Sequence, residues 1–162
     1  MLYKKGAGPM SKSGLESILP VAIKKLEEIS SVKVSRERID ETMKHAVHIV
    51  IHELAHVYVE KALPWLNNLE DNQHTLIDEV LARFLERKVS KELNLYVESF
   101  EEQLKELKMY SPLSNLDWNV KFYSKLYEDF EKHISRGGNL ESFGKSELTR
   151  RLRASYVQKP KQ

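Results

Sequence analysis

Two histidines and a glutamate stand together in the stretch His52-Glu53-Leu54-Ala55-His56, which has the pattern H-E-x-x-H. Histidines four residues apart lie one above the other on the same face of a helix, so both imidazoles can reach one metal ion. Nitrogen ligands at about 2.0–2.1 Å suit zinc, and the glutamate can act as general base toward a zinc-activated water. The pattern therefore predicts one zinc ion held by His52 and His56, with Glu53 as the catalytic base.

The surroundings of the motif bear on a plainer hypothesis, in which buried histidines only satisfy their own hydrogen bonds. Residues 46–59 are apolar on nearly every side of the expected helix, apart from the histidines and Glu53. A buried glutamate with no cation or donor nearby would be costly, which favours a metal site. Because Glu53 lies between His52 and His56, it favours that pair as ligands. We expect His48 in the core or behind the ligands, and His45 near the surface.

A third protein ligand should come from a different helix. The extended pattern H-E-x-x-H-x-x-G-x-x-H is absent, because Val59 and Ala62 occupy the places of its glycine and its last histidine. The candidates on the next expected helix are His74, Asp78, Glu79 and Glu86. Glu79 lies away from the apolar side of that helix, and the small Ala82 one turn later lets another helix approach closely. Asp78 is the second choice, and His74 is a weaker third.

The two motifs together, "HELAH" and "DEVLARFLE", resemble the gluzincin metallopeptidases, the class of thermolysin and the zinc aminopeptidases. In the zinc aminopeptidases the glutamate ligand is followed by an alanine, an arginine, an aromatic residue and a second glutamate. The matching positions in this chain are Glu79, Ala82, Arg83, Phe84 and Glu86. The resemblance covers residues 52–86. It implies that Glu79 is the third zinc ligand and that the protein hydrolyses peptide bonds.

The chain also departs from that class. The aminopeptidase motif G-x-M-E-N is absent, so aminopeptidase specificity is not carried over. The only strand candidate before the motif is "SSVKVS", which is a loop or one short strand, whereas such enzymes bind extended substrate along a sheet edge. Four side chains are candidates for stabilising an oxyanion, and none is assigned that role: Tyr110, Tyr123, Tyr127 and His133.

Apolar residues recur with helical periodicity along most of the chain, and the helices that this pattern predicts must position the candidate site residues. Apolar spacing and breaker residues predict helices over 15–29 (with Pro20 inside), 36–63, 74–93, 96–109, 116–134 and 145–157. The expected fold is therefore mainly α, a compact zincin-like core of about six helices with at most a small β-hairpin. We expect a flexible leader over 1–14, a single domain over 15–157 and a basic tail over 158–162.

Composition limits the partners. The 162 residues include no cysteine, which excludes a thiolate zinc site, and the formal net charge of +2 argues against nucleic acid. No apolar stretch is long enough for a membrane span, so we expect a cytoplasmic protein whose partner is a peptide or protein substrate. Residues 145–162 carry six positive charges and one negative charge. That basic end could stay solvated, bind nucleic acid or an acidic partner, or fold over the metal cleft.

Two other functions remain open at this stage. Glu53 to His56 is also an E-x-x-H unit, as used in carboxylate-bridged dimetal helix bundles, but the only approximate second unit is the D-x-x-H from Asp71 to His74. The other possibility is a non-catalytic metal-binding or interaction protein that uses its basic C-terminal helix.

Overall fold

The computed structural model describes residues 12–45, 50–95, 97–109 and 117–154 of the chain. Its elements are α1 (Lys12–Ser30), α2 (Arg36–His45), α3 (Val50–Ala62), the 3-10 helix η1 (Pro64–Asn68), α4 (Asp71–Glu92), α5 (Phe100–Leu107), α6 (Val120–Ser135), α7 (Leu140–Gly144) and α8 (Glu147–Ala154). No β-strand is found in these four ranges. The predicted mainly α fold is confirmed, and "SSVKVS" contributes a connection instead of a strand.

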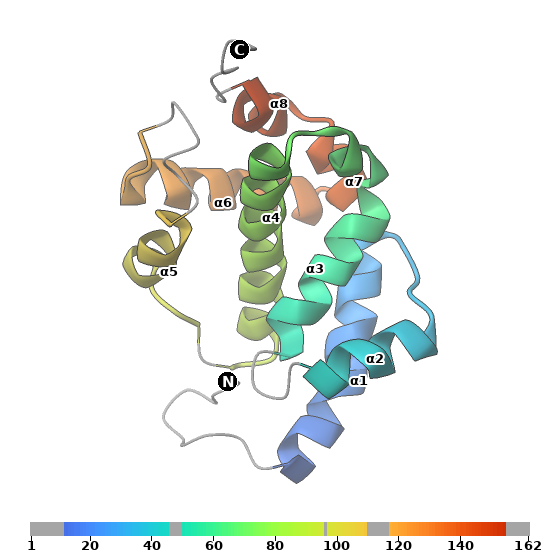
Figure 1. Cartoon of the computed structure of the whole chain (residues 1–162). Coiled ribbons are helices and arrows are strands. Elements are labelled where there is room, and N and C mark those ends of the chain that lie inside the picture. The colour runs from blue at the N-terminus through green and yellow to red at the C-terminus, as the bar shows by residue number, and fades with distance from the viewer. Residues whose placement is uncertain (1–11, 46–49, 96, 110–116, 155–162) are drawn as a thin grey trace.

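Helix α4 is the central element of the fold (Figure 1). Helices α1 and α3 lie on one side of it, α5 and α6 lie on the other, and α8 packs near its N-terminal end. Buried side chains from α1 through α8 form one contiguous core. Helices α3 and α4 run in opposite directions and share the most extensive interface, so the sequence between them only has to turn the chain round.

That turn follows from Pro64. Proline cannot continue a helix because it lacks an N–H and its ring clashes with the preceding turn, but it suits the first turn of a new one. Helix α3 accordingly ends at Ala62 and Pro64 begins η1, which leads to α4. Helix α4 begins at Asp71, three residues before the predicted start at His74, with its aspartate in the first turn, where a negative charge is favoured.

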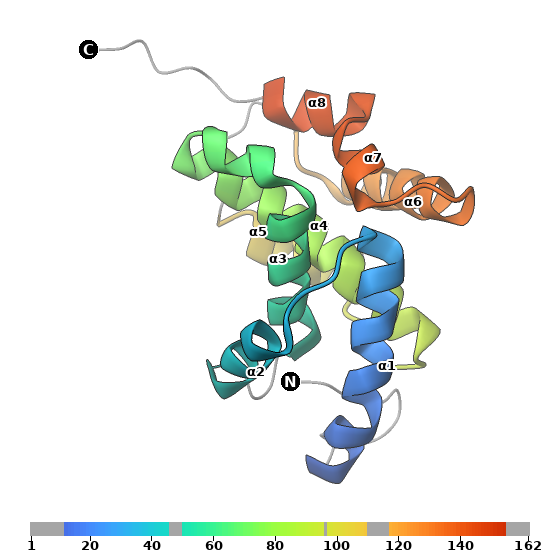
Figure 2. The ribbon, with the colours of Figure 1, turned by 90° about the vertical axis from the view of Figure 1, so that its right-hand side faces the viewer.

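The prediction of one helix over residues 36–63 is wrong. Arg38 Nη2 lies 3.7 Å from Glu60 Oε2, which is impossible along one straight helix, where residues that far apart would be separated by about 33 Å. Helix α2 instead lies beside α3 (Figure 2). Its sequence is mostly charged, so it covers the surface, whereas the apolar residues of α3 pack into the core.

Other boundaries differ because capping residues decide them. Ser99 forms a capping box with Glu102, so α5 begins at Phe100 rather than at 96. Asn119 caps α6, which therefore begins at Val120. The separate short helix α7, capped by Asn139, was not predicted. Residues 12–14 of the predicted leader belong to α1, which continues through Pro20, whereas 1–11 and the predicted tail 158–162 lie outside the described residues.

No helix in the described ranges has the length and apolar character that a membrane span requires.

Candidate metal centre

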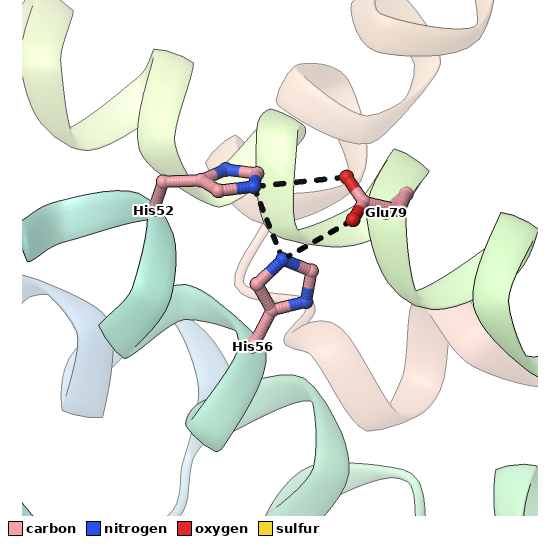
Figure 3. Close-up of side chains that lie close together, drawn as sticks. All are labelled: His52, His56 and Glu79. Carbon is pink, nitrogen blue, oxygen red and sulfur yellow. Dashed lines mark hydrogen bonds and ion pairs between the residues drawn. The ribbon is translucent and has the colours of Figure 1, made fainter. Parts of the chain in front are cut away.

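The side chains of α3 divide into a core face and an outer face. Leu54, Ala55 and Tyr58 are fully buried, whereas Glu53 and His56 are partly exposed. His52 lies at the boundary, with 8% of its surface exposed. The i, i+4 spacing of His52 and His56 places both rings at the side of the helix that meets α4 (Figure 3).

Three predicted ligands converge at this interface. His52 Nε2 and His56 Nε2 lie 3.0 Å apart. Glu79, from α4, places Oε2 3.6 Å from His52 Nε2 and Oε1 3.7 Å from His56 Nε2. Figure 3 shows both ring nitrogens and the carboxylate turned toward one point. Within the described ranges, these residues are the only group of three or more candidate ligands whose donor atoms all lie within 4.8 Å of one another.

The spacing of the donor atoms can be tested against zinc. Two ligand atoms bound tetrahedrally at zinc–ligand distances near 2.0–2.1 Å are roughly 3.3 Å apart. The observed separations of 3.0, 3.6 and 3.7 Å lie on both sides of that value within a few tenths of an ångström. These distances involve four atoms, because His52 and His56 each face a different oxygen of Glu79. Two imidazoles and one carboxylate gathered at this point form a ligand set of the kind that zinc binds.

The other nitrogen of each ring is held by a carboxylate of α4. The Nδ1–H of His56 donates to Asp78 Oδ2 at 2.7 Å, and that of His52 donates to Glu86 Oε2 at 2.9 Å. Because an ionised carboxylate only accepts, each ring carries hydrogen on Nδ1. In the neutral imidazoles the two Nε2 atoms then present lone pairs to each other. Carboxylates behind metal-binding histidines fix the ring tautomer and orientation in this way.

A proton or a metal ion between the two Nε2 atoms would relieve the repulsion of their lone pairs. Burial opposes protonation of His52, but hydrogen bonds with Glu79 and Glu86 outweigh it and raise the pKa of His52 to about 9. Burial also opposes ionisation of Glu79, yet the two histidines and Arg83 hold its pKa below 4.5. Without metal, a proton on His52 supplies the positive charge. A divalent metal would have to replace that proton.

Arg83 completes the electrostatics of the site. It is 9% exposed, and its Nη2 lies 3.5 Å from Glu79 Oε2 and 2.8 Å from Glu106 Oε2 on α5. Arg83 therefore lies between a carboxylate of the ligand group and a carboxylate of α5, and its positive charge helps to keep Glu79 ionised.

Glu53 stands apart from the ligand group and is partly exposed, so the expectation that it is buried is wrong. It makes no hydrogen bond or ion pair with any described residue, and it lines an open cleft of about 440 Å³ beside His56. Helices α2, α3 and α4 supply the walls of this cleft, which include Arg38, Thr42, Glu60, His74 and Asp78. A carboxylate with no other partner, next to the metal ligands and open to solvent, is suitably placed to exchange protons.

The structure places the other candidates outside the ligand group. Asp78 and Glu86, considered as ligands, bind the far nitrogens instead, a role not foreseen from the sequence. His74 lines the cleft. His48 lies outside the described residues, and His45 ends α2. The sequence did contain a signal for these roles. Because α3 and α4 run in opposite directions, the earlier histidine, His52, lies beside the later acid, Glu86, and His56 lies beside Asp78.

The three described side chains that were considered for oxyanion stabilisation do not line the cleft. Tyr123 and Tyr127 are buried between α5 and α6 and donate to Gln103 and Glu131, at 3.2 and 2.8 Å. His133 Nε2 lies 2.7 Å from Ser142 Oγ. Tyr110 lies outside the described residues.

The basic last helix does not reach the cleft either. Helix α8 packs against α4 and α7, and the Arg153 guanidinium lies over the ring of Trp65 at 4.3 Å. The part of the predicted covering tail that follows Ala154 lies outside the described residues.

No protein-family model, no curated protein and no solved structure matches this chain. The class of protein is therefore defined by the fold and the site alone: an all-helical domain with a candidate mononuclear metal centre of two histidines and one carboxylate.

Proposed function

We propose that the protein is a zinc-dependent metallopeptidase with a gluzincin-like site built from helices. The observation that carries the proposal is the convergence of His52 Nε2, His56 Nε2 and Glu79 on one point while Asp78 and Glu86 hold the opposite nitrogens. Two histidines and a glutamate with one open position form the ligand set of catalytic zinc in several peptidases.

Each residue has a distinct task. His52, His56 and Glu79 bind the ion, and Asp78 and Glu86 orient the imidazoles. A bound zinc ion supplies Lewis acidity and lowers the pKa of water. Glu53 accepts a proton on its carboxylate and returns it to the leaving amine, for which an unpaired position in the cleft is suitable. Arg83 keeps Glu79 ionised and in place.

The substrate would bind in the cleft beside His56. Since the described ranges contain no strand, the peptide would be held by side chains from α2, α3 and α4 instead of a sheet edge. Support for a peptide, as distinct from another hydrolysable substrate, comes from the resemblance of residues 52–86 to gluzincins.

Replacing Glu53 by glutamine tests the proposal. We expect one zinc per chain in both the wild type and Glu53→Gln, by elemental analysis and anomalous scattering. Hydrolysis of a mixed peptide library should fall by at least about 100-fold in the variant, the loss typical for a missing general base. Zinc bound at one equivalent with no cleavage by the wild type would refute the peptidase. Iron as the native metal would refute zinc, because a two-histidine, one-carboxylate set also suits Fe(II).

A dimetal site finds no support in the described residues. Asp71 and His74 do not join a second ligand group, and Glu53 does not bridge toward them. Two metals per chain in the elemental analysis would reverse this conclusion.

A further inference from the structure

The cleft beside His56 continues along α3. A second hollow of about 450 Å³ lies farther toward the C-terminal end of this helix. The two hollows share the lining residues Arg38, Val57 and Glu60, so they form one groove, called here the α3 groove. Its far wall is the connection between α1 and α2, which crosses the outer side of α3 in Figure 2.

The two ends of the α3 groove carry opposite charge. Glu53 and Asp78 line the end next to the metal ligands. Lys33 and Lys61 line the far end; both are exposed, and neither pairs with a carboxylate of a described residue. Glu60, the one acid lining the far hollow, lies 3.7 Å from Arg38 Nη2, which offsets its charge. The far end is therefore positively charged, although the whole chain is nearly neutral.

Apolar surface accompanies these charges. Val34, Val57 and Pro64 line the same hollow, and two of them belong to the stretch from α3 to η1 that forms its floor. A side chain with an aliphatic stem and a carboxylate at its tip matches such a surface better than a compact inorganic anion does. Peptide ligands commonly combine an apolar contact that positions the chain with charges that select it.

We infer that the α3 groove selects peptides with acidic side chains on one side of the cleaved bond. This inference rests on the proposed peptidase function. From His56 to Lys61 the rise along α3 is about 7.5 Å, at 1.5 Å per residue. An extended peptide covers that span in about two to three residues, at roughly 3.3 Å each. The selected carboxylates should stand at that distance from the bond.

Binding measured without cleavage tests this inference. The full-length Glu53→Gln chain is loaded with zinc and titrated with a fluorescein-labelled nonapeptide of alanine and leucine that carries three glutamates in one half. The comparison probe has glutamines in their place. We expect the acidic peptide to bind about tenfold more tightly at low ionic strength, and this preference to shrink with added salt.

Two matched variants locate the effect. Lys33→Glu with Lys61→Glu should abolish the preference. Lys105→Glu with Lys121→Glu changes the net charge equally on α5 and α6, on the other side of α4, and should leave the preference in place. All four lysines are exposed, and circular dichroism verifies folding. If a charge reversal unfolds the chain, the milder double variant Lys33→Gln with Lys61→Gln should reduce the preference for the acidic peptide from about tenfold to about threefold.

Equal binding of the two peptides would overturn the inference, and so would equal loss of preference in the two double variants. These outcomes are separate from failure of the proposed function. If the wild type prefers the acidic peptide but cleaves nothing, the peptidase function is disproved and the selectivity of the groove stands. If the wild type cleaves both peptides and binds them equally, the peptidase function stands and the selectivity of the groove is disproved.

Discussion

The two sides of α4 bury polar groups in different ways. On the side of α6, Phe84 packs against Tyr123, Tyr127 and Phe130, with ring centroids 5.4 to 5.6 Å away. The hydroxyl of Tyr127 donates to Glu131, so the polar tip of this buried ring has a partner. On the side of α3, two carboxylates hold histidines by their far nitrogens, and a third carboxylate faces the near ones.

This difference suggests separate roles for the two sides of α4, with one side stabilising the fold and the other offering groups that can bind a ligand. On the aromatic side the rings fill space and both tyrosine hydroxyls are hydrogen-bonded, but the Nε of Arg87, whose guanidinium lies over Phe100, has no hydrogen bond. On the α3 side, Glu79 Oε2 is buried with no hydrogen bond, and its charged neighbours, His52 Nε2 and Arg83 Nη2, lie 3.6 and 3.5 Å away. Buried polar atoms left in this state are costly unless a further group binds them. The α6 side is packed mainly by rings, whereas the α3 side gathers the donor atoms of the candidate metal centre.

Truncating the aromatic side should have the largest effect on folding. Phe84→Ala removes a fully buried ring and should lower the free energy of unfolding by about 3–5 kcal/mol. Urea denaturation measures the loss, and zinc stoichiometry of the folded fraction should stay at one. Phe84→Leu leaves a smaller cavity and is the control. A large loss of zinc binding in Phe84→Leu would show that the two sides are not independent.

Zinc should stabilise the α3 side only while Glu79 is present. Free zinc at a hundred times its Kd should raise the free energy of unfolding by about 2.7 kcal/mol in the wild type, since it binds only the folded chain. Glu79→Ala should show almost no gain at the same concentration. The measurement is thermal unfolding with and without zinc. An equal gain in the variant would remove Glu79 from the ligand set.

Weakening the support behind the histidines should have a smaller effect. Asp78→Asn and Glu86→Gln keep the shape of each side chain but lose its charge, and each should lower zinc affinity by about 10–100-fold. Competition with a fluorescent chelator measures this. Asp71→Asn, on the first turn of the same helix, is the matched control and should bind zinc normally. If Asp78→Asn eliminates zinc binding altogether, Asp78 is itself a ligand.

The smallest effect should come from a polar contact on the aromatic side. Burial opposes ionisation of Glu131, but hydrogen bonds from Lys91 and Tyr127 outweigh it and hold its pKa below 4.5. Its ionised form therefore adds stability above pH 4.5, and this contribution disappears as the pH falls through the lower pKa of the folded state. Glu131 is about a third exposed, so Glu131→Gln should cost less than about 1 kcal/mol at pH 7.

The pH dependence distinguishes this contact from simple packing. Wild type and Glu131→Gln should become equally stable in strongly acidic solution, as followed by urea denaturation at several pH values. A difference that persists there would mean that the side chain acts by its shape and not by its charge.

Much of the fold could be predicted because it depends on local patterns. The apolar spacing of α1, α4 and α6 identified these helices, and Pro64 marked the end of α3. The errors arose where distant contacts decide. Residues 36–45 read as a continuation of the histidine helix, yet this charged segment gains more by lying on the surface beside α3, where Arg38 meets Glu60. Helix α7 is too short to show a period.

The ligand types and the helical spacing of His52 and His56 are properties of the sequence by itself, because a fixed helical geometry brings residues four apart to one face. Which acid of α4 meets them was decided only by the tertiary structure. Asp78, Glu79 and Glu86 are chemically equivalent candidates, and their roles depend on how α4 is rotated and shifted against α3. Packing of the apolar side chains between the two helices sets that register, and it turns Glu79 toward the near nitrogens while Asp78 and Glu86 reach the far ones.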